Sequence, residues 1–146
     1  MPTESGPTHR LAAMADILEQ AHASLRADLT ALRAGEARPA TAPGAELARH
    51  CLSFCTALGE HHAKEDGAFA ELDTRFPHLT QVLTRLRTEH RTIAANLSRL
   101  RTLADHPAAP QPSPAHLQQE LATLEADLEA HFAYEEQELL PALRAA

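Results

Sequence analysis

The stretch LQQELATLEADLEAHFAYEEQELL, residues 117–140, decides the fold class of this chain. Leucines recur in it every three or four positions, which is the spacing of the buried face of an amphipathic helix. The apolar stripe passes through His131 and Glu135 before it resumes at Leu139. Periodicity therefore assigns this stretch to a helix, and the two polar residues on its buried face need an explanation of their own.

Three other stretches of the chain show the same periodicity. We expect four helices, with Thr8 and Ser113 as N-caps and Gly35 as a C-cap, over residues 9–34, 45–72, 78–105 and 114–143. Long amphipathic helices joined by short connections pack as antiparallel neighbours. The sequence therefore predicts an all-α fold, an up-down-up-down antiparallel four-helix bundle over residues 9–146, preceded by a disordered or flexible N-terminus at residues 1–8.

Composition limits the class of protein further. The length of 146 residues fits one domain, and isoleucine and valine together number only three, which argues against a β-sheet fold. The net charge of −7 argues against nucleic acid or an anionic membrane as a partner. Neither a transmembrane run nor a secretory signal is visible, so we expect a cytoplasmic protein.

The two cysteines, Cys51 and Cys55, lie four positions apart in the second helical pattern. We interpret them as small buried residues in a reducing cytoplasm. A redox pair is the alternative, but a helix holds the two Cβ atoms of such a pair too far apart for an easy disulfide.

Each apolar stripe is interrupted by ionisable residues where leucine is expected. The six residues are His22, His61, Glu65, His90, His131 and Glu135. Measured along the helices from the connections, all of them lie at one level of the bundle. A lone core histidine, or a His-x-x-x-Glu pair on a solvated face, is common without any ligand. Six buried ionisable groups together are too costly unless a bound metal compensates them.

The pattern also repeats along the chain. One histidine followed by His-x-x-x-Glu occurs in each pair of helices, which predicts pseudo-twofold symmetry. Each half would supply two nitrogens and one carboxylate, and two metals bridged by two carboxylates is the natural interpretation. Ligands of this type favour iron, while zinc and manganese stay open.

These residues resemble the hemerythrin-like family of His-His-Glu cation-binding domains over roughly residues 11–143. The resemblance is carried by EQAHASL, GEHHAKED, RTEHRTI and AHFAYEEQELLP. It implies a non-haem di-iron centre, with a bridging oxo or hydroxo group, that meets dioxygen, peroxide or nitric oxide. By motif matching, the four histidines become iron ligands (His22, His61, His90 and His131), and Glu65 and Glu135 become bridges.

The chain departs from the oxygen-carrying hemerythrins at one position. Those proteins have a second histidine one turn after the third-helix ligand, and the residue there is Ala94. With four histidines, two bridging carboxylates and a bridging oxygen, two octahedral irons would keep two open positions, which favours reaction over reversible carriage. We expect Ala94 to face one of them, so that Ala94→His would slow peroxide turnover. Ala94, Gly67 and Ala68 are candidate walls of a substrate pocket.

Several neighbours of the six residues are candidates for supporting roles. We expect His62 to lie at the surface or beside the ligands, so that His62→Ala keeps both metals; the alternative is a fifth nitrogen ligand. Glu136 is the alternative to Glu135 as the fourth-helix ligand. Tyr134 is a candidate hydrogen-bond partner of a bound oxygen species, and Glu138 lies near the core face.

The remaining polar candidates are expected away from the centre. Arg26 is expected to reach solvent. The other five histidines are expected at the surface or at helix ends, namely His9, His50, His78, His106 and His116.

The favoured hypothesis is a hemerythrin-like di-iron protein that reacts with peroxide, nitric oxide or dioxygen, whether or not it is an enzyme. The alternative is a module that binds or senses dioxygen or nitric oxide, or stores iron, without turnover. A third hypothesis is an oxygenase or oxidase acting on a small organic substrate, which would need a pocket beside the metals.

Overall fold

The computed structural model of this chain describes residues 7–34, 43–104 and 114–145. The elements are four long helices and one 3-10 turn, in the order α1 (Pro7–Arg33), α2 (Pro43–Arg75), η1 (Pro77–Leu79), α3 (Thr80–Ala104) and α4 (Pro114–Ala145). No strand occurs in these described ranges. The predicted all-α fold is therefore confirmed.

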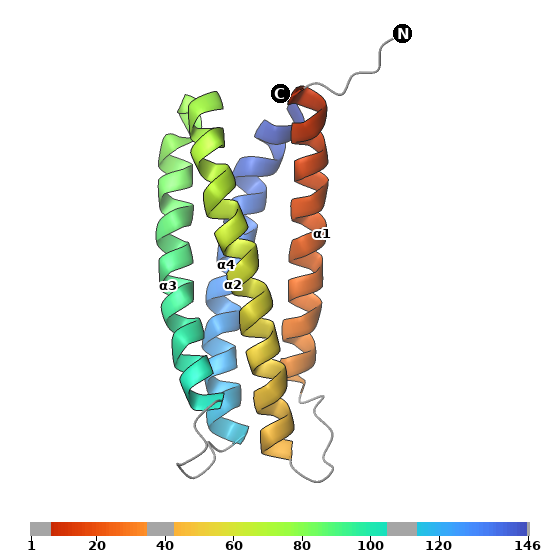
Figure 1. The fold of residues 1–146 in the computed structure, drawn as a ribbon, viewed down its shortest axis with the longest axis vertical. Coiled ribbons are helices and arrows are strands. Elements are labelled where there is room, and N and C mark those ends of the chain that lie inside the picture. The colour runs from red at the N-terminus through yellow and green to blue at the C-terminus, as the bar shows by residue number, and fades with distance from the viewer. Residues whose placement is uncertain (1–6, 35–42, 105–113, 146) are drawn as a thin grey trace.

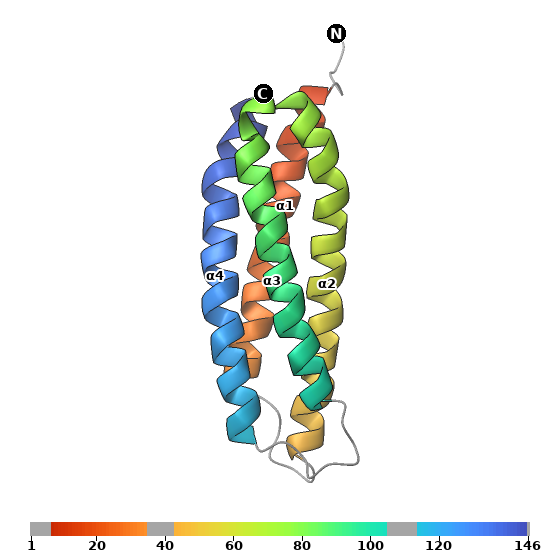
Figure 2. The ribbon, with the colours of Figure 1, turned by 90° about the vertical axis from the view of Figure 1, so that its left-hand side faces the viewer.

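The helices form an up-down-up-down bundle (Figure 1). The start of α1, the end of α4 and the turn between α2 and α3 all lie at one end of it. Each helix packs against two neighbours, α1 and α3 both against α2 and α4, so α1 lies diagonally opposite α3. A second view, at right angles, shows the same elongated arrangement (Figure 2). Every side chain on an inward stripe therefore meets residues from the other helices.

Prolines mark where several elements begin. Pro7, Pro43 and Pro114 each open a helix, where the missing N–H costs nothing because the first turn has no acceptor for it. Helix α1 thus begins one residue before the predicted cap Thr8. Helix α2 ends at Arg75 rather than residue 72, because Pro77 disfavours a helical conformation at Phe76, whose φ and ψ are −128° and 76°. The other predicted caps, Gly35 and Ser113, and residues 1–6 lie outside the described residues.

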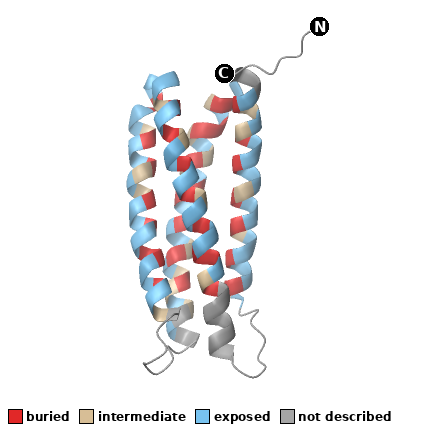
Figure 3. Cartoon of the chain, in the orientation of Figure 1, coloured by how far each residue is buried: buried red, intermediate tan, exposed pale blue. Residues whose placement is uncertain are grey.

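Buried residues follow the inner face of all four helices (Figure 3). They form two apolar clusters, one at each end of the bundle. Leu58, Leu100 and Leu124 belong to the first, and Leu72, Leu83 and Leu143 to the second. The level between the two clusters holds the buried histidines and glutamates. The apolar ends therefore fix the helices, and the polar level is held between them.

The two cysteines belong to the first apolar cluster. Both are 1% exposed and both are free thiols. Burial raises the pKa of the Cys51 thiol to about 11, so this group stays protonated near neutral pH. The structure thus places both side chains in the core, as the sequence predicted.

Among the described helices, none combines the length and the apolar character that crossing a membrane requires.

Candidate metal centre

Seven ionisable side chains converge in the middle of the bundle. All six residues predicted from the broken stripes are among them, and His62 is the seventh. Helix α1 supplies His22, and α3 supplies His90. Helix α2 supplies two histidines and a glutamate, and α4 supplies His131 and Glu135. Six of the seven are less than 9% exposed, and the His61 side chain is 14% exposed.

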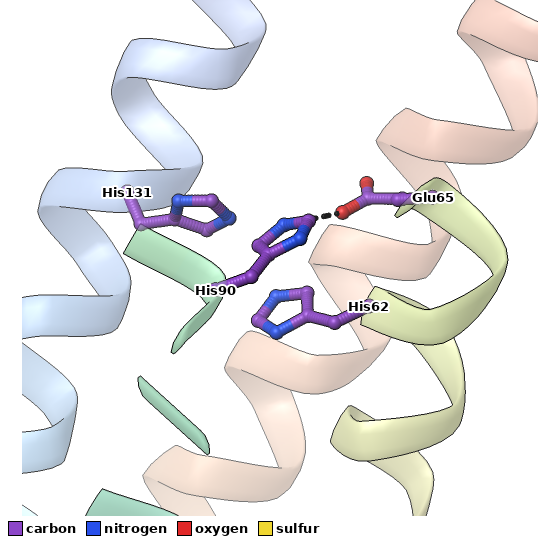
Figure 4. A group of neighbouring side chains, drawn as sticks. All are labelled: His62, Glu65, His90 and His131. Carbon is purple, nitrogen blue, oxygen red and sulfur yellow. Dashed lines mark ion pairs between the residues drawn. The ribbon is translucent and has the colours of Figure 1, made fainter. Parts of the chain in front are cut away.

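These residues form two groups that share one carboxylate. The three-histidine group consists of His62, His90, His131 and Glu65 (Figure 4). The two-histidine group consists of His22, His61, Glu135 and again Glu65. Within each group, one ligand atom from every member lies within 4.8 Å of all the others. Each group therefore offers four convergent donors of the kinds that iron, zinc and manganese bind.

Glu65 points one oxygen at each group. Its Oε1 lies 3.1 Å from Nε2 of His90, in the three-histidine group. Its Oε2 lies 3.0 Å from Nε2 of His61 and 3.8 Å from Nε2 of His22, in the two-histidine group. Separate oxygens directed at separate donor sets are the arrangement of a carboxylate that bridges two cations.

The converging atoms lack the hydrogen bonds that buried polar atoms require. Nine buried atoms here have no hydrogen-bond partner: Nε2 of all five histidines and both carboxylate oxygens of Glu65 and Glu135. The 2.7 Å approach of His22 Nε2 to Glu135 Oε1 is close, but the atoms are not aligned as a hydrogen bond. One such buried atom costs about 1–3 kcal/mol. A set of nine lone-pair donors facing one another fits bound cations, which would satisfy all of them.

Outer carboxylates hold three of the rings so that Nε2 faces inward. Nδ1 of His22 lies 2.7 Å from Glu136, Nδ1 of His90 2.8 Å from Asp66, and Nδ1 of His131 2.8 Å from Glu89. A carboxylate on Nδ1 fixes the tautomer and the ring orientation of a ligating histidine. Sequence reasoning missed Asp66 and Glu89, although each directly adjoins a predicted ligand in the sequence, Glu65 and His90 respectively.

Glu136 and Arg26 support the centre from outside. Glu136 accepts from Nδ1 of His22 and belongs to neither group, so it holds a ligand in place rather than replacing Glu135. The guanidinium of Arg26 donates to Glu136 and to Glu129, at 2.9 Å in each case. The expectation that Arg26 simply reaches solvent was therefore wrong, because two α4 carboxylates hold its head group against the bundle.

The carboxylates and the burial shift the pKa values in opposite directions. Burial acts to lower the pKa of His22, but Glu135, Glu65 and Glu136 outweigh it and raise this pKa to about 10. Burial among other imidazoles lowers the pKa of His62 to about 2. Burial also raises the pKa of Glu135, while His22, His61 and His90 hold that of Glu65 well below its usual range. His62 and Glu65 thus already have the protonation states that bind metal, whereas His22 and Glu135 each release a proton when a cation binds.

His62 is a member of the three-histidine group rather than a surface residue. It is 6% exposed, and its ring stacks on His90 with centroids 4.0 Å apart. The expected pseudo-twofold symmetry is accordingly absent from this centre, because one group has three histidines and the other has two. Helix α2 packs against both α1 and α3, so adjacent residues on it, His61 and His62, serve different groups.

Ala94 does not face the centre. It is an exposed residue of α3, whereas its neighbour Ile93 is 1% exposed in the core. The expectation that Ala94 borders an open position was wrong, because α3 turns Ile93 inward one turn after His90. Gly67 is exposed as well, and a Cβ added there would meet nothing within 4 Å. Of the three small residues expected around a pocket, Ala68 lines the one between α1, α2 and α4.

The remaining candidates lie apart from both groups. Tyr134 packs under Arg85, whose guanidinium carbon is 3.7 Å from the ring centroid. Glu138 is half-buried and belongs to neither group. His78 and His116 are exposed, as expected. The side chains of the other three histidines, His9, His50 and His106, lie outside the described residues.

The fold and this centre define the class of the protein as a four-helix bundle with an internal cation site. The family model of the hemerythrin HHE cation-binding domain matches residues 13–143, which is most of the chain. The chain therefore belongs to the hemerythrin HHE family, whose domain binds cations. Comparisons with curated proteins and with solved structures give no match.

Proposed function

We propose that this chain is a non-haem di-iron protein that binds peroxide, nitric oxide or dioxygen at its metal centre and reduces it. The observation that carries the proposal is the pair of four-donor groups that share Glu65, with one oxygen of this residue directed at each group. When bound, two iron ions would supply the electrons for this chemistry.

The residues of the chain have separate tasks in this proposal. Glu65 joins the two groups, and its negative charge, with that of Glu135, offsets the charge of two cations in a buried place. Glu136, Asp66 and Glu89 keep three imidazoles oriented through Nδ1. Phe132 stacks on His22 with centroids 4.0 Å apart and is fully buried, so it keeps water from that face of the ring.

The oxidant is assigned to the two-histidine group. Both groups have four donors, but this group includes His61, whose side chain is 14% exposed and is the most exposed of the seven converging residues. His61 and Glu65 of this group also line a pocket that opens toward solvent. The pocket supplies a route by which a small molecule reaches the centre without displacing a protein ligand.

A second candidate function is reversible binding of dioxygen or nitric oxide without turnover, and His62 favours it. As a fifth imidazole, His62 removes one of the two open positions that four histidines would leave. If Glu135 also held the ion of the three-histidine group, the centre would be more completely filled by protein donors and would suit reversible binding. If Glu135 held only the ion of its own group, the centre would suit reduction of peroxide.

Metal analysis and kinetics test these proposals in turn. Protein expressed in iron-replete medium should contain about two irons per chain, as two four-donor groups require. A folded chain that takes up no transition metal on reconstitution would refute the di-iron proposal. Consumption of peroxide in a single turnover of the reduced protein, sustained only when a chemical reductant is added, supports reduction. An oxygen-dependent spectrum that reverses under vacuum, without peroxide consumption, supports the second candidate.

A further inference from the structure

An apolar pocket of about 160 Å³ lies between α1, α2 and α4. Most of its wall is aliphatic or aromatic, with Leu18 from α1, Phe69 from α2 and Leu139 from α4. The wall continues outward to Ile17, whose side chain is 66% exposed. The pocket is thus open to solvent on one side and apolar along most of its surface.

The polar part of this pocket is its end at the metal centre. His61, Lys64 and Glu65 are the three lining residues that carry polar heads, and they occupy neighbouring turns of α2. His61 and Glu65 are members of the two-histidine group. A molecule seated in the pocket would therefore have an apolar part along the helices and one end beside that group.

The composition of this wall favours an uncharged ligand. Lys64 is the only lysine of the chain, and it has no ion pair within the described ranges. An ionised head would lose its hydration against the apolar wall, and a cationic head would also meet the ammonium of Lys64. A hydroxyl or carbonyl can instead accept a hydrogen bond from Lys64.

The volume sets the size of the ligand. An apolar protein cavity of about 150 Å³ holds a molecule the size of benzene, with about six non-hydrogen atoms. We propose that this pocket binds a small uncharged aliphatic molecule with one polar end, seated beside the two-histidine group. The inference rests on the proposed function, since it gives the centre a neighbouring organic ligand, but the binding itself needs only the pocket.

The two isoleucines of the chain make a direct test possible. Ile17 lines the pocket, whereas Ile93 is buried in the apolar cluster at the opposite end of the centre. In zinc-loaded full-length protein with labelled isoleucine methyl groups, 1-hexanol should shift the Ile17 signal and leave the Ile93 signal in place. No shift of Ile17, or equal shifts of both signals, would overturn the proposal.

Filling the pocket gives a second, independent measurement. Ala68→Leu places three more carbons in the pocket. We therefore expect calorimetry to show that 1-hexanol binds at least about tenfold more weakly. Ala63→Leu is the matched control, because Ala63 is an exposed residue of the same helix and does not line the pocket. Ala21→Leu fills the pocket from α1, so a folding failure of one variant leaves the other to decide.

The preference for an uncharged ligand and the metal content can be measured on the same samples. Hexanoate and hexylamine should bind more weakly than 1-hexanol, and tighter binding of either would refute the uncharged class. Unchanged 1-hexanol binding in Ala68→Leu and in Ala21→Leu would refute the pocket itself. Metal content, measured in parallel, keeps the two proposals apart: a chain that binds 1-hexanol but takes up no iron contradicts only the proposed function.

Discussion

The three-histidine group and the two-histidine group use the same kinds of donor but differ in their surroundings. His62, His90 and His131 are all at most 6% exposed, and their rings contact one another in the core. In the two-histidine group, His61 is partly exposed and lines a pocket open to solvent. The first group is therefore suited to hold an ion firmly, and the second to expose an ion to small molecules.

This difference originates in the helices that supply the donors. The three-histidine group draws on α2, α3 and α4, and the two-histidine group on α1, α2 and α4. Helix α1 contributes one imidazole, and farther along its length it forms a pocket wall with Met14, Ile17 and Leu18. The two groups have nearly the same donors, but small molecules can reach the two-histidine group through a pocket, because α1 forms a pocket wall beside it.

The largest expected effect is that of removing the shared carboxylate. Glu65→Gln preserves the shape of the side chain but removes the charge that both groups use, so both ions should be lost. Elemental analysis of protein with normal helical circular dichroism measures this. Glu60→Gln, an exposed position on the same helix, is the control and should retain both ions. Two retained ions in Glu65→Gln would show that this residue does not bridge the groups.

Removing one histidine from either group should show that each group holds its own ion. His62→Ala should cost the ion of the three-histidine group, and His61→Ala that of the two-histidine group, leaving about one ion per chain in each variant because the other donor set is intact. The structure thus reverses the sequence-based expectation that His62→Ala keeps both metals. Full metal content in His62→Ala would show that this residue lies beside the ligands and does not bind an ion.

A smaller effect is expected from the outer carboxylates. Glu89→Gln weakens the hold on Nδ1 of His131, and the loss of such a partner lowers metal affinity about 10–100-fold. Competition with a chelator measures the affinity while the total capacity stays the same. Glu71→Gln is the matched control, because this exposed carboxylate only approaches Arg75, at 3.9 Å. Equal affinities in the two variants would mean that Glu89 does not orient the ring.

The smallest effect is expected at Ala94. Because this residue is exposed, the imidazole of Ala94→His should point to solvent, and metal content, peroxide kinetics and oxygen spectra should stay unchanged. This reverses the expectation from the family pattern, in which the position completes a ligand set. Slower peroxide turnover with a longer-lived oxygen spectrum in this variant would show that the α3 residue does approach an ion.

The helices and six of the seven converging residues were predictable because each lies on a stripe whose period the sequence displays. His22 between Leu18 and Leu25, and His90 between Leu86 and Ile93, must face inward wherever the leucines do. The outer carboxylates carried no such signal. Asp66 and Glu89 lie on half-exposed helix faces, where acidic residues are ordinary, and only the approach of another helix gives them a histidine partner.

The sequence by itself determined the four helices, the level at which polar residues break their stripes and the hemerythrin HHE family. Only the tertiary structure decided which role each of two adjacent residues has. His61 and His62 belong to different groups, and Glu135 is a donor whereas Glu136 holds the ring of His22. Adjacent positions on a helix lie about 100° apart, so both border the buried face. Which of them points into the core depends on the rotation of the helix among its neighbours, and packing sets that rotation.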